Sequence, residues 1–325
     1  MFGKPDPCSG CNTGRIFVED QTRGLSIGAK AECPSTGRIH VCSRTKPTST
    51  ASCKTGDVHT CMETTGVYGR DLANFLVQKQ LLVSVVNPAQ IHAFGKTELN
   101  RAKTDKADAR LIARYCRMHR PAPWAPPAEE IATLQALVQR LEDLLGLQTM
   151  ENSRLEAATG PARESVEVVL QFIEQQIEMV RLQIQIHIDQ HPRLKSQKKL
   201  LSSIPGIADN TAATLLAFLS PVERFHSAKQ VVAYAGLNPR IRQSGQWAGK
   251  SPIAKTGNAL LRKALYLPAV VAKRHNPVIA AFCDRLLARG KRPMQVVVAA
   301  MRRLLHLVFG VLKSGKPFDP KFGLA

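Results

Sequence analysis

The alternation of apolar and polar residues predicts an α/β arrangement in the first half of the chain. Residues 58–62 form a short strand-like segment, and residues 82–86 are an uninterrupted apolar run, as expected for a buried parallel strand. Residues 71–77 between them have a helical pattern, and another helix is expected from about Asp105. Alternation of strand and helix predicts a parallel sheet with crossover helices.

Two long helical stretches follow a proline-rich segment at residues 120–127. Apolar residues recur at steps of three and four along residues 131–144 and again along residues 166–188. Such stripes predict either an antiparallel hairpin or a coiled coil between chains, and packing against the protein's own domains is an equal alternative. The proline-rich segment is predicted to be an extended linker and a domain boundary.

From residue 196 the pattern predicts a mostly helical domain. Residues 200–207 and 211–216 look like a helix-hairpin-helix motif. In such a motif Gly206 would permit the tight turn, and the N-terminus of the second helix would hold a phosphate. A simple helical turn has a similar pattern. The last strong helical pattern covers residues 296–312.

Charge narrows the class of partner. The 325 residues contain 45 Lys and Arg against 25 Asp and Glu, a formal net charge of +20. Residues 196–325 contain 21 basic and four acidic residues, a balance of +17, which favours a polyanionic partner. Aromatic residues make up 5%, which argues against single-strand binding by stacking. The chain has no membrane-length apolar run and no signal peptide, so the cytoplasm is the expected location.

Asp105 and Asp108 are candidate metal ligands. Their spacing puts both carboxylates on one face of a helix. Two adjacent carboxylates need a cation or a shared proton, and oxygen-rich acidic clusters suit Mg²⁺. Lys103, Lys106 and Arg110 interleave with the acids, so a phosphate backbone can approach. The alternative is that the two acids offset the dipole of their helix.

Several separate motifs resemble one family of transposases. They read METTGVYGRDLANFL, VSVVNPAQIHAFGKTELNRAKTDKADARLIARYCR, IPGIADNTAATLLAFL, YAGLNPRIRQSG and KTGNALLRKALYLPAVVAKRHNP. They are similar to transposases of the insertion-sequence 110 family, in its 1111 subgroup, from about Val58 to Pro320. The resemblance implies a RuvC-like (RNase H-like) nuclease domain with an Asp-Glu-Asp-Asp tetrad. It also implies a coiled coil and a mostly α C-terminal domain with a nucleophilic serine.

The resemblance assigns three of the four acids. Glu63 matches the Glu of the tetrad, and Asp105 and Asp108 match its last two Asp, so Mg²⁺ is the implied cofactor. The first Asp has no clear counterpart. Among residues 1–57 only residues 15–20 are strand-like, and Asp20 is the candidate substitute ligand. We interpret this region as altered, so that it no longer encodes the first two strands of the domain.

The resemblance also identifies the nucleophile. Ser244, in a Gln-Ser-Gly motif, matches the family's nucleophilic serine, and Ser251 is the alternative. A serine hydroxyl needs a base or a metal to take its proton, and cationic groups to stabilise the transition state. Candidate nucleic-acid-binding residues, including two arginines suited to that stabilisation, are Lys103, Lys106, Arg110, Gly206, Arg240, Arg242, Lys255, Arg262 and Lys263.

The predicted protein is a transposase or site-specific DNA recombinase. The resemblance implies double-stranded DNA and a structured guide RNA as partners, and a homo-oligomer formed through the coiled coil. The expected divisions are residues 1–57, 58–127, 128–195 and 196–325. Two alternatives stay open: a metal-dependent RuvC-like junction nuclease in which Ser244 is structural, and an inactive nucleic-acid-binding relic that lacks the first Asp.

Overall fold

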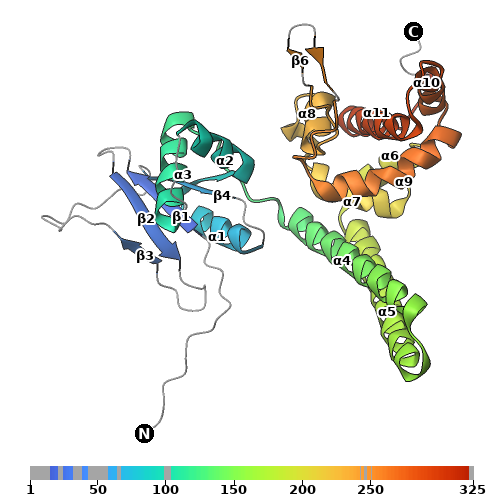
Figure 1. Cartoon of the computed structure of the whole chain (residues 1–325), viewed down its shortest axis with the longest axis horizontal. Helices are drawn as coiled ribbons and strands as arrows, with labels where there is room; N and C mark the ends of the chain where they lie inside the picture. The colour runs from blue at the N-terminus through green and yellow to red at the C-terminus, as the bar shows by residue number, and fades with distance from the viewer. Residues whose placement is uncertain are drawn as a thin grey trace, which may run out of the picture. The chain divides into compact units, whose positions relative to one another are not determined.

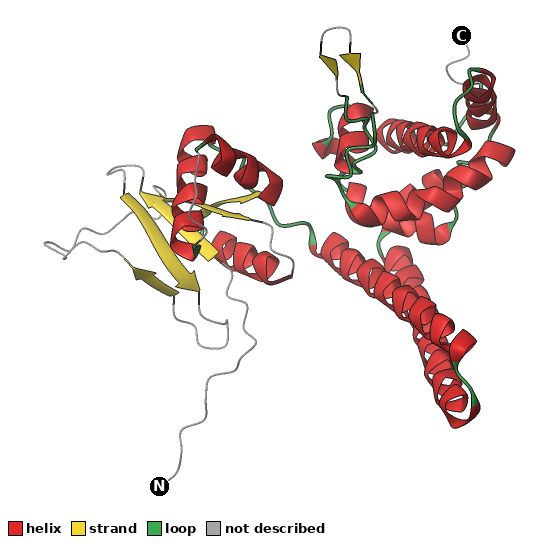
Figure 2. Cartoon of the chain, in the orientation of Figure 1, coloured by secondary structure: helices red, strands yellow, loops and turns green. Residues whose placement is uncertain are grey.

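The chain has two compact units, Met1–Pro126 and Pro127–Ala325. The computed structural model describes residues 15–20, 25–31, 39–42, 58–63, 67–98, 104–241, 243–244, 247–249 and 251–321. The division falls inside the proline-rich segment. The long helical hairpin and the C-terminal domain form one unit, because a single hydrophobic cluster extends from Ile131 to Leu312. Figure 2 shows strands with helices in the first unit and mostly helices in the second.

The first unit has a five-stranded mixed sheet in the order β3-β2-β1-β4-β5 (Figure 1). Its strands are β1 (Arg15–Asp20), β2 (Leu25–Ala31), β3 (Ile39–Cys42), β4 (Val58–Glu63) and β5 (Leu82–Val86). β4 and β5 pair in parallel. In the chain they precede and follow α1 (Val67–Gln78), as the strand-helix-strand pattern predicts. The other three pairings are antiparallel.

The N-terminal region has more strands than the one strand-like segment, residues 15–20, that the sequence predicted. Three strands precede residue 58, and β1 pairs with both β2 and β4. The signal missed in the sequence is the period-two alternation of Leu25, Ile27, Ala29 and Ala31, since alternate residues of a strand share one face. Small side chains made this alternation a weak hydrophobic signal.

Two capped helices complete the first unit. In α2 (Pro88–Thr97) the Asn87 side chain accepts a hydrogen bond from the Ala89 N–H at 2.9 Å. In α3 (Asp105–His119) the Thr104 hydroxyl accepts one from the Ala107 N–H at 3.2 Å. Such N-caps satisfy donors that the first turn leaves free. The caps therefore fix where each helix begins, and Asp105 is the first residue of α3.

The second unit begins with an antiparallel hairpin of α4 (Glu129–Ala157) and α5 (Gly160–Gln190). The apolar stripes predicted from the sequence face each other within the chain. Their buried members are Ile131, Leu134, Val138, Leu141, Leu144, Leu170, Ile173, Ile177, Val180, Ile184 and Ile188. These stripes are therefore not available to a second chain.

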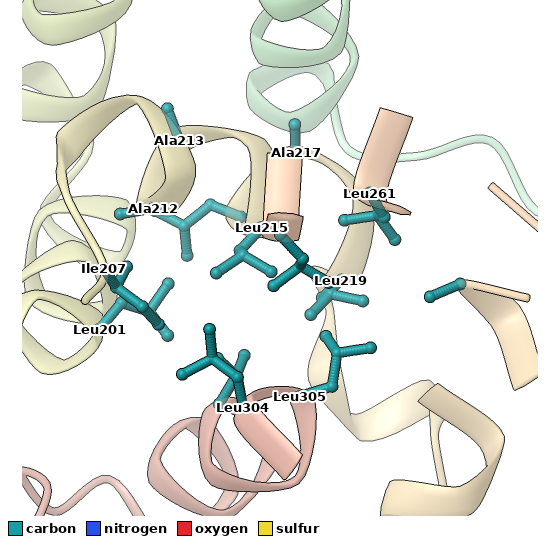
Figure 3. Close-up of a cluster of buried hydrophobic side chains, with 14 of the residues drawn as sticks. Leu201, Ile207, Ala212, Ala213, Leu215, Ala217, Leu219, Leu261, Leu304 and Leu305 are labelled. Carbon is teal, nitrogen blue, oxygen red and sulfur yellow. The ribbon is translucent and has the colours of Figure 1, made fainter. Parts of the chain in front are cut away.

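The remaining helices are α6 (Pro192–Ser202), α7 (Asp209–Leu219), α8 (Ala228–Tyr234), α9 (Ala259–His275), α10 (Pro277–Ala288) and α11 (Pro293–Ser314). Of these, α6 and α7 pack on the base of this hairpin and the others pack around them. Figure 3 shows the core, where Leu215 and Leu219 of α7 meet Leu304 and Leu305 of α11. By length and composition α11 could cross a membrane, but here one of its faces forms this core.

Candidate functional site

The acidic residues belong to two stripes that face each other in the first unit. Alternate residues of β4 share one face of the sheet, so Glu63 projects on the same side as Cys61 and His59. On α3, Asp108 and Cys116 are separated by two helical turns and lie on one helix face. Cys61 and Cys116 are hydrogen-bonded to each other. This contact joins the β4 stripe to the α3 stripe.

A buried polar network surrounds the two thiols. His59 Nε2 lies 2.8 Å from Ser84 Oγ, and that hydroxyl also lies 2.8 Å from the Pro121 carbonyl oxygen. Hydrogen bonding between the thiols lowers the pKa of Cys116 and raises that of Cys61, and a hydrogen bond with His59 lowers the pKa of Cys116 further. The network fixes α3 and the linker against the sheet. It was not foreseen from the sequence.

The candidate ligands themselves are only partly described. Glu63 and Asp108 are half-buried, whereas the side chain of Asp105 lies outside the described part of the chain. Among the side chains that the structure describes, no group of three or more His, Cys, Asp or Glu has a metal-binding arrangement. Carboxylate oxygens are nevertheless the donors that Mg²⁺ prefers, so the chemistry of this donor set fits a hard divalent ion.

Asp20 is not brought to the other acids. In the antiparallel pairing of β1 with β4, Asp20 is opposite Val58, whereas Glu63 is at the other end of β4. Five residues of strand separate the two positions by about 17 Å. The antiparallel direction of this pairing argues against Asp20 as the substitute ligand.

Ser244 lies on a two-stranded arm of the second unit. β6 (Gln243–Ser244) pairs with β7 (Trp247–Ala248), with Ser244 opposite Trp247. The arm extends from the helices beside α8 (Figure 1). The Ser244 side chain is exposed. A hydroxyl presented in this way is accessible to a phosphate of a bound nucleic acid.

Four backbone hydrogen bonds hold the base of the arm. The N–H of Arg240 donates to the Pro252 carbonyl at 2.7 Å, and the N–H of Ala254 donates to the Asn238 carbonyl at 2.8 Å. Nearer the helices, the N–H groups of Lys255 and Asn258 donate to the Gly236 and Tyr234 carbonyls at 3.2 and 2.7 Å. The chain therefore enters and leaves the arm as a paired ribbon, which sets the arm's direction.

The ribbon crosses itself at two glycines beside Arg262. A Cβ on Gly257 would lie 2.2 Å from the Tyr234 carbonyl oxygen and 2.3 Å from the Gly236 nitrogen. Arg262 Nη1 donates to the carbonyls of Ala235 at 3.0 Å and Gly257 at 2.9 Å. We call Gly236, Gly257 and Arg262 the arm clamp. Arg262 was predicted to bind nucleic acid, whereas these contacts give it a structural role.

Gly257→Ala is expected to lower the free energy of unfolding by about 2–4 kcal/mol, because the new methyl group would overlap backbone atoms that cannot rotate away. Chemical denaturation measures this effect. Gly146→Ala is the matched control, since a Cβ there would meet nothing within 4 Å. Equal stability of the two variants would contradict the close crossing.

The other predicted nucleic-acid-binding cations have different surroundings. Arg110, Arg240 and Lys255 are exposed, and Lys263 forms an ion pair with Glu142 of α4. Lys103 and Arg242 lie outside the described residues, as does the side chain of Lys106. Arg240 and Lys255 belong to the ribbon that carries Ser244, so two of the exposed cations lie on the segment of the candidate nucleophile.

Gly206 is explained by packing. A Cβ at this position would lie 2.9 Å from both the Pro268 carbonyl oxygen and the Ala272 Cβ of α9. The first turn of α7 also carries Asp209, whose negative charge disfavours a phosphate at that N-terminus. The helix-hairpin-helix reading, in which the Gly206 turn contacts DNA, is therefore not supported by the geometry.

Comparison with known proteins identifies the class. A model described as Transposase IS116/IS110/IS902 family matches residues 198–284. A second transposase model, named for the DEDD acids and for IS110, matches residues 46–158. The first range contains the arm and its clamp, and the second contains Glu63, Asp105 and Asp108. These two matches cover both candidate sites.

Several relatives are similar over different lengths. A pilin gene-inverting protein of Moraxella lacunata is 35% identical over 269 residues, which is 82% of this chain and 84% of that protein. An uncharacterized 43.6 kDa protein of insertion element IS110 from Streptomyces coelicolor is 28% identical, over 47% of this chain and 36% of its own length. The transposase of IS1111A from Coxiella burnetii is 36% identical, over 23% and 21%.

The chain belongs to the IS110/IS116/IS902 family of transposases. It is an enzyme of DNA transposition and recombination by this membership, and its similarity to the IS1111A transposase is consistent with the 1111 subgroup. The DEDD domain indicates dependence on a divalent metal.

Proposed function

We propose that this transposase cuts and rejoins double-stranded DNA with Ser244 as the nucleophile and with Mg²⁺ held by Glu63, Asp105 and Asp108. The observation that carries the proposal is the presentation of Ser244. Its hydroxyl is exposed on a paired arm whose base is fixed by the arm clamp. A serine with only a structural role would not need to be exposed on an arm of fixed direction.

The reaction consists of two phosphoryl transfers. Attack by the Ser244 oxygen on a DNA phosphorus forms a phosphoserine ester and releases a hydroxyl end of the cut strand. Attack by a strand hydroxyl on that ester joins the new strand and restores the serine. A bound divalent ion lowers the charge that builds on the phosphate oxygens. Arg240, exposed on the same ribbon, adds positive charge there.

Trapping the covalent intermediate tests the proposal. A plasmid with the element ends is incubated with the protein and Mg²⁺, the reaction is stopped with denaturant, and the nucleotide-linked peptide is identified by mass spectrometry. We expect the link at Ser244. A link at Ser251 would refute the assignment of the nucleophile. Cleavage without any protein–DNA link would favour a junction nuclease, and binding without cleavage would favour an inactive relic.

DNA affinity is expected to fall by roughly tenfold or more between 50 and 200 mM salt, because basic side chains release counterions from the phosphates. The charge balance of +17 in residues 196–325 places most of this effect in the second unit. Fluorescence anisotropy with a labelled duplex measures it. An affinity that does not change with salt would contradict the electrostatic account.

A second candidate function is inversion of a DNA segment. It is favoured by the 35% identity to the pilin gene-inverting protein, which extends over 84% of that protein. The same serine chemistry serves inversion and transposition, because both join cut strands to new partners. A plasmid with two sites in opposite orientation distinguishes them: inversion returns the segment reversed, whereas transposition inserts it at another position.

The remaining parts of the proposal concern partners and location. By family resemblance we infer a structured guide RNA from the element, action in the cytoplasm and assembly as a homo-oligomer. Recombination that depends on adding this RNA to the purified protein would support guidance, and full activity after nuclease removal of RNA would exclude it.

A further inference from the structure

The solvent side of α11 carries a cluster of basic side chains. His306 follows Arg302 by four residues and Arg303 by three, so the three side chains share one face of the helix. Lys229 belongs to α8, which packs against α11, and it is close enough to His306 to affect its pKa. We call these four residues the α8–α11 cluster. Lys229 and Arg303 are exposed, and Arg302 and His306 are half-buried.

No acid balances this cluster within the described part of the chain. The 22 residues of α11 include no Asp or Glu, and neither Lys229 nor the two arginines form an ion pair with a described residue. In the helices from α6 to α10 and the short turn Val222–Arg224, the acids are Asp209, Glu223 and Asp284. None of these three is among the charges that act on His306. Like charges held together repel each other, so the cluster is suited to a bound anion.

His306 has a ring nitrogen without a partner. Its Nε2 atom is buried and has no hydrogen-bond partner in the described part of the chain, which is unfavourable for a polar atom. Burial, together with Arg302, Arg303 and Lys229, lowers the pKa of His306, so the ring is uncharged at neutral pH. Gly310 lies one turn further along the same face, and a Cβ there would meet nothing within 4 Å. The surface beside His306 is therefore open to a ligand.

We propose that the α8–α11 cluster binds phosphate groups of double-stranded DNA. A phosphate supplies both the negative charge that the cluster lacks and an acceptor for His306 Nε2. The position of α8 favours DNA as the source of the phosphate. α8 ends at Tyr234, whose carbonyl accepts a hydrogen bond from the Asn258 N–H at 2.7 Å at the base of the arm (Figure 1).

This inference deepens the proposed function and rests on it, because it names a site for the DNA on which Ser244 acts. The helix that carries Lys229 leads directly into the ribbon that carries Ser244. A duplex held at the cluster would be fixed on the same part of the fold as the arm. Phosphate contacts set the position of DNA but do not read its sequence. We therefore expect the cluster to strengthen binding equally for a duplex with the element end and for an unrelated duplex.

Arg302→Gln with Arg303→Gln in the full chain tests the proposal. DNA affinity at 50 mM salt should fall at least tenfold, and the slope of log affinity against log salt should become smaller by about two. Fluorescence anisotropy without Mg²⁺ measures both, so that no strand is cut. Arg140→Gln with Arg163→Gln is the matched control, because it removes two exposed arginines from the α4–α5 hairpin and should bind like the parent. Equal losses in the two double variants, or none in the first, would overturn the proposal.

His306→Leu separates binding from stability. If Nε2 donates to a phosphate, DNA affinity should fall by about threefold to tenfold. The midpoint of chemical denaturation should stay the same or rise, because leucine has no polar atom to leave buried without a partner. A lower midpoint with unchanged affinity would give His306 a structural role and exclude it from the site.

Lysine footprinting identifies the source of the phosphate. Bound duplex DNA should protect Lys229 from acetylation but should not protect Lys195, whose side chain is 64% exposed. Protection of Lys229 by an RNA hairpin and not by the duplex would overturn the assignment to DNA. Ser244→Ala should show the same protection as the parent, so a failed nucleophile assignment leaves this test intact. Recombination by the parent without protection of Lys229 would refute the cluster and leave the proposed function standing.

Discussion

Ser244→Ala is expected to eliminate the protein–DNA adduct and to lower recombination by roughly 10³-fold or more, because alanine has no hydroxyl oxygen to attack the phosphate. The serine side chain is exposed on β6, so a methyl group in its place disturbs no packing. The arm should keep its direction, which depends on the arm clamp. DNA binding should therefore remain close to that of the parent.

The measurement is recombination of a supercoiled plasmid, with adduct formation scored on denaturing gels. Ser251→Ala is the matched control. It changes an exposed serine seven residues further along, beside the ribbon, and should recombine like the parent. If Ser244→Ala recombines normally while Ser251→Ala does not, the nucleophile belongs to the second position.

Local hydrophobic patterns predicted much of the fold. The parallel pair of β4 and β5 was predicted because it depends on apolar residues close together in sequence. The two helical stripes were predicted as well, but the sequence left open whether they pair within the chain, as α4 and α5 do, or between chains. The start of α3 at Asp105 follows from the Thr104 cap. The spacing of apolar residues shows which positions of a single helix or strand are buried. It therefore predicts elements of this kind, whose buried residues lie close together in sequence.

Long-range backbone contacts were not predictable in the same way. Gly236 and Gly257 are twenty-one residues apart, and their close approach depends on how the ribbon closes. Arg262 looks like a surface cation in sequence, although it donates to carbonyls of that ribbon. The recurring glycines in YAGL and KTGN were the available signal, because a position without a side chain permits close approach of two backbones.

α5 illustrates a different limit. Its sequence has apolar residues on two opposite faces, and the more regular of these, within residues 166–188, predicted the buried face. The structure buries that face against α4 and leaves Phe172 and Leu182, on the opposite face, exposed. The sequence alone did not show which of the two faces packs within the chain.

Asp108→Asn is expected to lower strand cleavage by roughly 10³-fold, because the amide removes a negative charge from the proposed metal ligands. The substitution preserves shape and leaves the backbone of α3 intact, including the hydrogen bond from the Asp108 N–H to the Thr104 carbonyl at 2.9 Å. Binding of DNA should change little, since most of the basic excess lies in residues 196–325.

Asp71→Asn provides the control for charge alone. Asp71 is an exposed acid on α1 of the same unit, so its neutralisation changes the net charge equally and should leave cleavage unchanged. Cleavage is measured as the conversion of supercoiled plasmid to nicked and linear products across a range of Mg²⁺ concentrations. If Asp108 is a metal ligand, added Mg²⁺ should partly restore cleavage by the Asp108→Asn variant. If Asp108 only offsets the dipole of α3, added Mg²⁺ should not change its cleavage. Cleavage by Asp108→Asn at the parent's rate would exclude Asp108 from the metal site.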